Sequence, residues 1–224
     1  EDSAVRLSRQ DAHGVIKYVT ATLLEVRPGL ASSPAMTELS AGAVEVLVFG
    51  ELYDDVFGEI MQQTEEKDEN LSAKVRELRE RCEDGRASLR GGDEVPSISQ
   101  SAIAALGSLP RARTPTDKLS HCVEFLERVS EHFSSSFRDE CIDADTLLIM
   151  VCQHIVAADV RHLRAEVAFI EEFSRDEQLL SGKEGYALIT LQASLHYLDC
   201  LDELPSDLSL AHTESDEMAV TSVE

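Results

Sequence analysis

The sequence contains no tryptophan, few aromatic residues and few basic ones. Of its 224 residues, 5% are aromatic, and 20 Lys and Arg stand against 43 Asp and Glu, which gives a formal charge of −23. Duplex nucleic acid and anionic membrane surfaces both attract clustered positive charge. The shortage of basic residues therefore argues against nucleic acid as a partner and favours other proteins. Most of the carboxylates are expected simply to keep the surface solvated.

Long apolar runs and a disulfide framework are also missing. No apolar stretch approaches the roughly 18 residues that a membrane-spanning helix needs, and no signal peptide is recognisable. We therefore expect a cytoplasmic protein without membrane insertion. An odd number of scattered cysteines predicts reduced, buried thiols rather than disulfides. These cysteines are Cys82, Cys122, Cys141, Cys152 and Cys200.

Recognisable sites for metals, nucleotides and bond-making chemistry are lacking as well. The densest metal-ligand groupings are pairs such as Cys152 with His154 and His196 with Cys200, too few ligands for a zinc site. Gly182-Lys183 lacks both the earlier glycine and the following Ser or Thr of a phosphate-binding loop. No nucleophile motif is present either. We therefore expect no metal, no cofactor and no enzyme of bond chemistry.

The residues that are present favour helices throughout. Hydrophobic residues make up 43% of the chain, alongside many Leu, Glu and Ala residues. This composition is typical of helical proteins, and the length suits one domain, or one domain with a subdomain. The sequence therefore predicts an all-α fold, with an N-terminal helical bundle packed against a second, layered helical domain.

Apolar spacing divides the chain into segments. Residues 11–27 and 37–63 carry apolar residues at three- and four-residue steps, which predicts an amphipathic helix and then a long, mostly buried one. The charged stretch 65–83 predicts a separate helix that lies mainly in solvent. Glycines and a proline in 84–96 suggest a flexible connection. The predicted parts are 1–92 for the bundle, 93–204 for the core helices and 205–224 for an acidic, disordered tail.

The most informative stretch runs from Asp143 to Leu201. Asp143 and Asp145 precede a strongly apolar run, so a helix is expected to begin near Asp145, with its first turn at the surface. Asp143 is the natural cap, which would leave Asp145 free to point outward. A second helix follows over 160–173, and two glycines then place Tyr186 at the entrance of a third.

These residues resemble the Vps-nine (vacuolar protein sorting nine) domain, the catalytic module of guanine-nucleotide exchange factors for early-endosomal Rab GTPases. Two motifs carry the resemblance after the acidic pair: Leu163-x-Ala-Glu-x-x-Phe-Ile170-x-x-Phe173 and Leu180-x-Gly-x-x-Gly-Tyr186. Upstream, Glu51-Leu-Tyr-Asp-Asp-Val-Phe57 and Thr114-Pro-Thr-Asp-Lys-Leu119 are similar to two further family elements. The four elements occur in the family's order, and the resemblance spans most of the chain.

The resemblance implies a function and a set of site residues. It implies exchange activity on Rab-five subfamily GTPases at endosomes, in endocytosis and vesicular transport, with recruitment through other parts of the parent protein. The helix-leading aspartate of the family points toward the phosphate-loop lysine and the Mg²⁺ site of the GTPase, and the tyrosine contacts the switch regions. By position these roles fall to Asp145 and Tyr186. The resemblance further implies a Rab-binding surface of Asp143, Ile149, Leu188, Ile189 and Thr190.

Other interpretations remain open at this point. Asp145 is equally suited to capping a helix, and Tyr186, Ile149, Ile189 and Leu188 to ordinary packing. Ile149 stands where the family often has proline, and Ile189 where a threonine usually follows the tyrosine. A Rab-binding module without exchange activity is therefore one alternative. A helical scaffold for unrelated protein partners is another.

Overall fold

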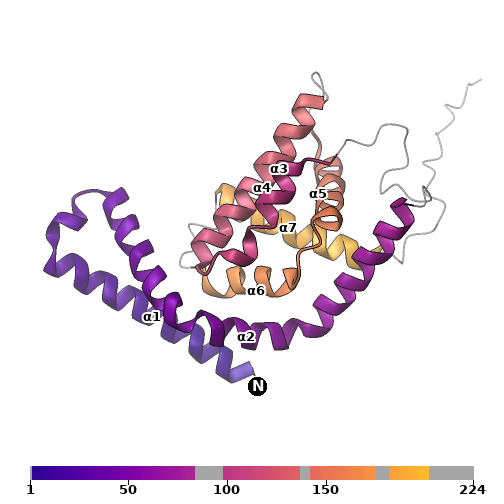
Figure 1. The fold of residues 1–224 in the computed structure, drawn as a ribbon. Helices are drawn as coiled ribbons and strands as arrows, with labels where there is room; N and C mark the ends of the chain where they lie inside the picture. The colour runs from indigo at the N-terminus through magenta and orange to yellow at the C-terminus, as the bar shows by residue number, and fades with distance from the viewer. Residues whose placement is uncertain (1, 84–97, 137–141, 175–181, 202–224) are drawn as a thin grey trace, which may run out of the picture.

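The computed structural model describes residues 2–83, 98–136, 142–174 and 182–201, and its regular elements within these ranges are all helices (Figure 1). The all-α prediction is confirmed. The predicted flexible connection at 84–96 and the predicted tail at 205–224 lie outside the described residues. The elements are α1 (Asp2–Val26), η1 (Pro28–Ala31), α2 (Pro34–Glu83), α3 (Gln100–Leu106), η2 (Leu109–Arg111), α4 (Pro115–Ser136), α5 (Ala144–Ala158), α6 (Leu163–Phe173) and α7 (Lys183–Cys200).

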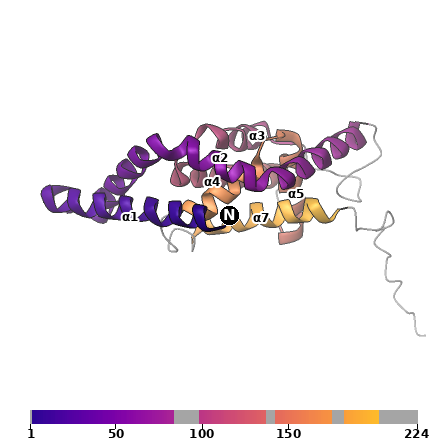
Figure 2. The same ribbon diagram turned by 90° about the horizontal axis from the view of Figure 1, so that it is seen from below.

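One continuous helix replaces the two that the sequence predicted between 37 and 83. Helix α2 is 50 residues long and runs through the predicted break near Gln63. The predicted break has neither a glycine nor a proline, since its residues are Gln63, Thr64 and Glu65. No residue there interrupts the backbone hydrogen bonds of the helix. Figure 2, seen from below, shows α2 extending along most of the length of the molecule. The helix therefore joins two parts of the fold that the sequence predicted separately.

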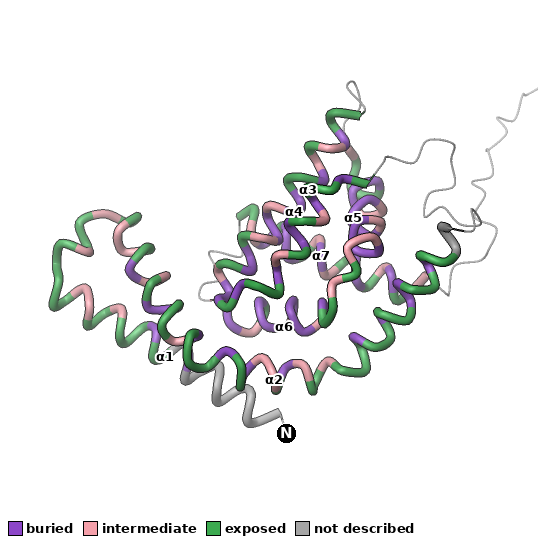
Figure 3. Tube along the Cα trace, viewed as in Figure 1, coloured by how far each residue is buried: buried purple, intermediate pink, exposed green. Residues whose placement is uncertain are grey.

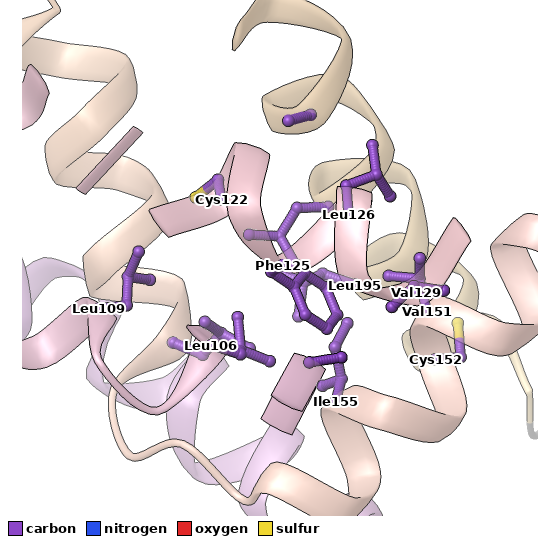
Figure 4. Close-up of a cluster of buried hydrophobic side chains, with 14 of the residues drawn as sticks. Leu106, Leu109, Cys122, Phe125, Leu126, Val129, Val151, Cys152, Ile155 and Leu195 are labelled. Atoms are coloured by element: carbon purple, nitrogen blue, oxygen red, sulfur yellow. The ribbon is translucent and has the colours of Figure 1, made fainter. Parts of the chain in front are cut away.

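The larger core lies among helices α3 to α7 and the second half of α2. Phe125, Val129, Val151 and Ile155 are at most 1% exposed and meet in the centre of this cluster (Figure 4). Leu71, Val75 and Leu78 of α2 belong to the same cluster, although this stretch was expected to lie mainly in solvent. Its thin apolar stripe is therefore fully used in packing. Figure 3 shows the resulting alternation of buried and exposed residues along α2.

A second, aromatic cluster joins the first half of α2 to α1 and α6. Phe49 packs edge-on against Phe169 and Phe173, with ring centroids 5.4 and 5.5 Å away. Ala12 and Ile16 of α1 belong to the same cluster. Edge-to-face aromatic pairs add about 0.5–1.5 kcal/mol beyond the area that they bury. The N-terminal helices are therefore packed directly onto the later ones.

Two acidic residues of α2 bind the start of other helices. Asp68 accepts hydrogen bonds from the backbone N–H groups of Arg164 and Ala165, at 2.8 and 3.2 Å. Glu45 accepts from the backbone N–H of Thr116 and from its hydroxyl, both at 3.0 Å. The first N–H groups of a helix have no partner inside the helix, and a carboxylate satisfies them well. Helix α2 thus fixes the starting points of α6 and α4.

A buried ion pair lies between α4 and α6. Lys118 and Glu166 are 0% and 2% exposed and are directly bonded to each other. The Lys118 ammonium also donates to the Leu109 carbonyl at 3.1 Å and lies over the rings of Tyr53 and Phe57, at 5.1 and 5.2 Å. Burial lowers the pKa of Lys118 and raises that of Glu166, while each partner opposes the shift of the other.

Two local predictions are confirmed in detail. Thr114 and Pro115 begin α4, where the Thr114 hydroxyl accepts from the Asp117 N–H at 3.0 Å. Helix α6 contains the apolar stripe predicted for it. Helix α1 begins at Asp2 rather than near residue 11, and Val15, Val19 and Val26 of its predicted stripe are exposed rather than packed. Between α5 and α6, Asp159 and His162 have positive φ angles, which allows the sharp turn without glycine. The short elements α3 and η2 had no strong periodic signal and were not predicted.

No single helix within the described residues is long and apolar enough to cross a membrane, although α5 and α6 would pass such a test together as a bent pair.

Candidate functional site

The start of α5 presents one aspartate outward and uses the other as a cap. The Asp143 carboxylate accepts from the Thr146 N–H at 2.6 Å and so occupies the cap position. Asp145 follows in the first turn and is exposed. No hydrogen bond or ion pair engages the Asp145 carboxylate within the described part of the chain. It is therefore a surface charge at the positive end of a helix, which stabilises it without neutralising it.

The start of α7 presents an aromatic ring. Tyr186 lies in the first turn and is 57% exposed, an unusually open position for a large ring. Its backbone N–H donates to the Gly182 carbonyl at 3.1 Å, which holds the residue in the helix. The predicted position of Tyr186 at a helix entrance is thus confirmed. The ring is available to another molecule.

A hollow of about 390 Å³ lies between the two helix starts and α4. Leu147 from the first turn of α5 and Tyr186 and Ala187 from the first turn of α7 line it, so both helix starts border the same space. Apolar side chains contribute most of its surface, which suits an apolar side chain of a protein partner. The remaining apolar wall comes from Val123, Leu126 and Ile142.

Charged residues stand at the edge of the hollow. Glu127 and Glu131 of α4 and Lys183 of α7 belong to its lining, and Lys183 pairs with Glu127 at 3.3 Å. Glu131 is bonded to Arg128 at 3.0 Å, outside the hollow. These pairs are more than 40% exposed, so they contribute little to stability and hold the edge of the hollow in place only loosely. An apolar floor with a charged rim is the usual build of a protein-binding site.

The residues predicted for the Rab-binding surface differ in their exposure and in their contacts. Ile189 is 63% exposed and lies on the same side of α7 as Tyr186, since three residues turn a helix by about 300°. Ile149 is part-buried and shares a face of α5 with Asp145, four residues earlier. The Thr190 hydroxyl donates to the Tyr186 carbonyl at 2.7 Å, so it is engaged by its own helix.

Leu188 does not belong to the exposed surface. It is 4% exposed and packs in the larger core cluster, so the alternative interpretation of ordinary packing holds for this residue. The reason is its position on α7, which turns Leu188 about 200° away from Tyr186. The residues of α4 that line the hollow were not predicted as site residues. Their spacing in the sequence is that of an ordinary buried apolar stripe.

The described residues contain no group of three or more His, Cys, Asp or Glu side chains that could hold a metal ion. Cys122, Cys152 and Cys200 are free thiols, and burial raises the pKa of Cys122 and of Cys152 to about 12. His154 is 1% exposed and accepts the Ser99 N–H on its Nε2 atom at 2.9 Å. Cys122, Cys152 and His154 are therefore buried core residues, whereas Cys200 is only partly buried.

In a comparison with protein families, residues 99–203 match the vacuolar sorting protein 9 (VPS9) domain, so this segment of the chain is similar to that family. The segment begins just before α3, ends after α7 and contains Asp145, Tyr186 and the hollow. The similar element at 51–57 lies outside it, on α2. Comparison with curated proteins gave no match.

A VPS9 domain is a nucleotide-exchange module rather than a catalyst of bond chemistry, and it binds small GTPases. The matched segment therefore implies a nucleotide-exchange function on a small GTPase.

Proposed function

We propose that this protein is a guanine-nucleotide exchange factor for early-endosomal Rab GTPases of the Rab-five subfamily and that Asp145 drives the release of GDP. The observation that carries the proposal is the exposed Asp145 carboxylate, which has no partner among the described residues and leads a helix inside a VPS9 domain. A carboxylate with a structural role would be engaged within its own fold, as Asp143 is.

The chemistry of the GTPase explains why a carboxylate is suitable. A GTPase holds GDP through backbone N–H groups and a lysine of its phosphate loop, with Mg²⁺ neutralising the phosphates. A carboxylate that reaches the same lysine competes with the diphosphate for the same positive charge. Asp145 would form this ion pair only after the diphosphate has left or shifted, so it would stabilise the nucleotide-free state selectively.

Tyr186 and the hollow between α4, α5 and α7 are the proposed receiving surface for the GTPase. Apolar residues of the switch regions would enter the hollow and pack against the Tyr186 ring, where aromatic residues commonly carry binding energy. Ile189 and Ile149 would extend this surface on either side. Binding here would hold the GTPase with its nucleotide site facing the start of α5.

The proposed setting is the cytoplasmic face of early endosomes, in endocytic vesicle transport. The net charge of −23 gives this chain no electrostatic attraction to an anionic membrane. Recruitment to the endosome would therefore depend on other parts of the parent protein, and no cofactor would be needed.

A second candidate function is Rab binding without exchange. The observation that favours it is Ile189, which is 63% exposed beside Tyr186 and adds apolar surface where the family usually has a threonine. Extra apolar contact strengthens binding of all nucleotide states alike, and uniform binding does not accelerate release.

Release of fluorescent GDP from a panel of Rab GTPases tests the proposal. The wild-type chain is expected to accelerate release from a Rab of the Rab-five subfamily, and Asp145→Ala is expected to lower this acceleration at least about tenfold, which corresponds to about 1.4 kcal/mol. Asp117→Ala is the matched control, because Asp117 is also an exposed acidic residue in the first turn of a helix.

The outcomes separate the candidates. Acceleration that Asp145→Ala lowers and Asp117→Ala preserves supports the proposal. Binding of a Rab without acceleration supports the second candidate. A wild-type chain that neither binds nor accelerates any Rab in the panel refutes both and leaves a helical scaffold for other partners.

A further inference from the structure

The first two helices carry an apolar surface that the rest of the described chain leaves open. Helix α1 folds back against the first half of α2, and this hairpin extends beyond the body formed by α3 to α7 (Figure 1). Seven large apolar side chains on it are between 38% and 72% exposed. We call them the apolar hairpin face: Val15, Tyr18, Val19 and Val26 of α1 with Leu39, Val46 and Leu47 of α2.

Helical geometry places both halves of this face on one side of the hairpin. On α1 the exposed stripe lies roughly 100° around the helix from Ala12 and Ile16, which pack in the cluster shared with α2. On α2 it lies at a similar angle from Val44, in the same cluster. In both helices the turn around the helix axis from the packed residues to the exposed stripe has the same sense along the chain. Because the two helices run in opposite directions, the two stripes then lie on the same side of the hairpin.

The spacing within the face favours a helical occupant. On α2, Leu39, Ala43, Val46 and Gly50 follow one another at steps of four, three and four residues, which is the heptad repeat of helices that pack against other helices. A lipid surface requires no such repeat, and membrane-binding helices carry Lys and Arg beside the apolar stripe. Neither stripe contains Lys or Arg, and the charged residue beside the α1 stripe is the acidic Glu25, seven residues after Tyr18.

Gly50 lies on the heptad stripe, although Gly42 and Gly58 of α2 have equally open surroundings. It lies inside α2, where glycine costs about 1 kcal/mol relative to alanine. A Cβ atom built on Gly50 would meet nothing within 4 Å, so no contact within the described chain requires glycine there. A second helix that packs on the heptad stripe would pass over Gly50, where the missing side chain lets the two backbones approach.

The area suits a second copy of this chain. With the exposures above and ordinary side-chain surfaces, the seven residues present about 700 Å² per copy, close to the ~800 Å² that each partner contributes to a standard interface. Patches on monomers are usually smaller than this. For a chain of charge −23, a face made mostly of apolar residues is also where two copies repel each other least.

We propose that two copies of this protein associate through their apolar hairpin faces, so that α1 and the first half of α2 from each copy form a four-helix bundle around a twofold axis. Such an interface is isologous, as in most homodimers, and Leu47 and Tyr18 are its most exposed members. The two exchange sites would lie on the separate bodies, outside the interface.

Molar mass in solution tests the proposal. Light scattering coupled to gel filtration is expected to give twice the mass of one chain for the wild type at concentrations up to about 100 µM, well above a Kd in the micromolar range. Leu47→Glu is expected to give the monomer mass, because it places a carboxylate on each side of the interface. Ile98→Glu is the matched control, since Ile98 is 42% exposed but lies outside α1 and α2, and it should remain a dimer.

Two further measurements keep the outcome clear. The helical circular dichroism of Leu47→Glu should equal that of the wild type, and Tyr18→Ser should also give the monomer mass. A wild-type chain that is monomeric at every concentration overturns the proposal. So does a monomer that sediments with neutral phosphatidylcholine vesicles through the same face, because a membrane would then be the occupant.

Discussion

The buried pair of Lys118 and Glu166 gives the sharpest stability prediction. Neither side chain reaches solvent, and the Lys118 ammonium contacts one carbonyl, the Glu166 carboxylate and the faces of aromatic rings. The substitution Glu166→Gln keeps the shape of the side chain and removes its charge. It would leave an ammonium group in the core with no counter-charge.

The expected cost follows from this burial. Removal of one partner of a buried ion pair typically destabilises a protein by about 3–5 kcal/mol, because the remaining charge stays desolvated. We expect Glu166→Gln to lower the free energy of unfolding by this amount at neutral pH. Loss of the pair also weakens the contact between α4 and α6, so the body of the VPS9 segment should unfold as a whole.

The opposite substitution should behave differently with pH. In Lys118→Met the remaining Glu166 carboxyl keeps the pKa that burial raises and loses the ammonium that opposed the shift. The pKa of this carboxyl is higher in the folded state than in the unfolded state. Its contribution to stability is therefore fully present below the unfolded-state pKa and is lost as the pH rises through the folded-state pKa. Lys118→Met should therefore be closest to wild-type stability at acid pH and lose stability toward neutral pH.

Urea unfolding of the wild type, both single variants and the double variant Lys118→Met/Glu166→Gln measures these effects as a double-mutant cycle. The free energy of unfolding of the double variant should be about 3 kcal/mol higher than the sum of the two single losses predicts. The reason is that the double variant leaves no unpaired charge in the core. Single costs below about 1 kcal/mol, or strict additivity in the double variant, would refute the assignment of a desolvated ion pair.

Three further predictions concern the other buried contacts. Asp68→Ala removes the cap of α6 and should cost about 1–2 kcal/mol in urea unfolding, whereas Glu69→Ala, its exposed neighbour, should stay within about 0.5 kcal/mol of wild type. Burial lowers the pKa of His154, so its contribution to stability is present above the unfolded pKa of about 6.5 and is lost as pH falls. His154→Leu should therefore reduce the decrease of the urea midpoint with falling pH below about pH 6.5, whereas His196→Gln, at an exposed position, should not. An unchanged pH dependence of the urea midpoint in His154→Leu would contradict a buried neutral imidazole. Of the three described cysteines, half-exposed Cys200 should be alkylated first in the folded protein and buried Cys122 and Cys152 only on unfolding, as mass mapping would show.

Local signals in the sequence predicted much of the fold. Thr114 with Pro115 and the pair Asp143 and Asp145 mark helix starts by their own chemistry, and the structure has helices beginning at these points. The continuity of α2 was not predicted, because the change from an apolar to a charged stretch near Gln63 suggested two helices. A change of surroundings along one helix produces the same pattern.

Contacts between distant residues were beyond reach of the sequence alone. Glu45 and Thr116 are 71 residues apart, and Asp68 and Arg164 are 96 apart, so no local pattern links them. In the candidate site, Asp145 was expected to point outward because Asp143 takes the cap. Leu188 was harder to place, since α7 carries apolar residues on several sides and periodicity alone does not select the buried one.

The relative affinity of the chain for nucleotide-free and GDP-loaded Rab tests the central role of Asp145 most directly. Competition for the phosphate-loop lysine predicts that the wild type binds the nucleotide-free form more tightly and that Asp145→Ala removes most of this preference while the affinity for the GDP-loaded form changes little. An undiminished preference in Asp145→Ala would contradict the account.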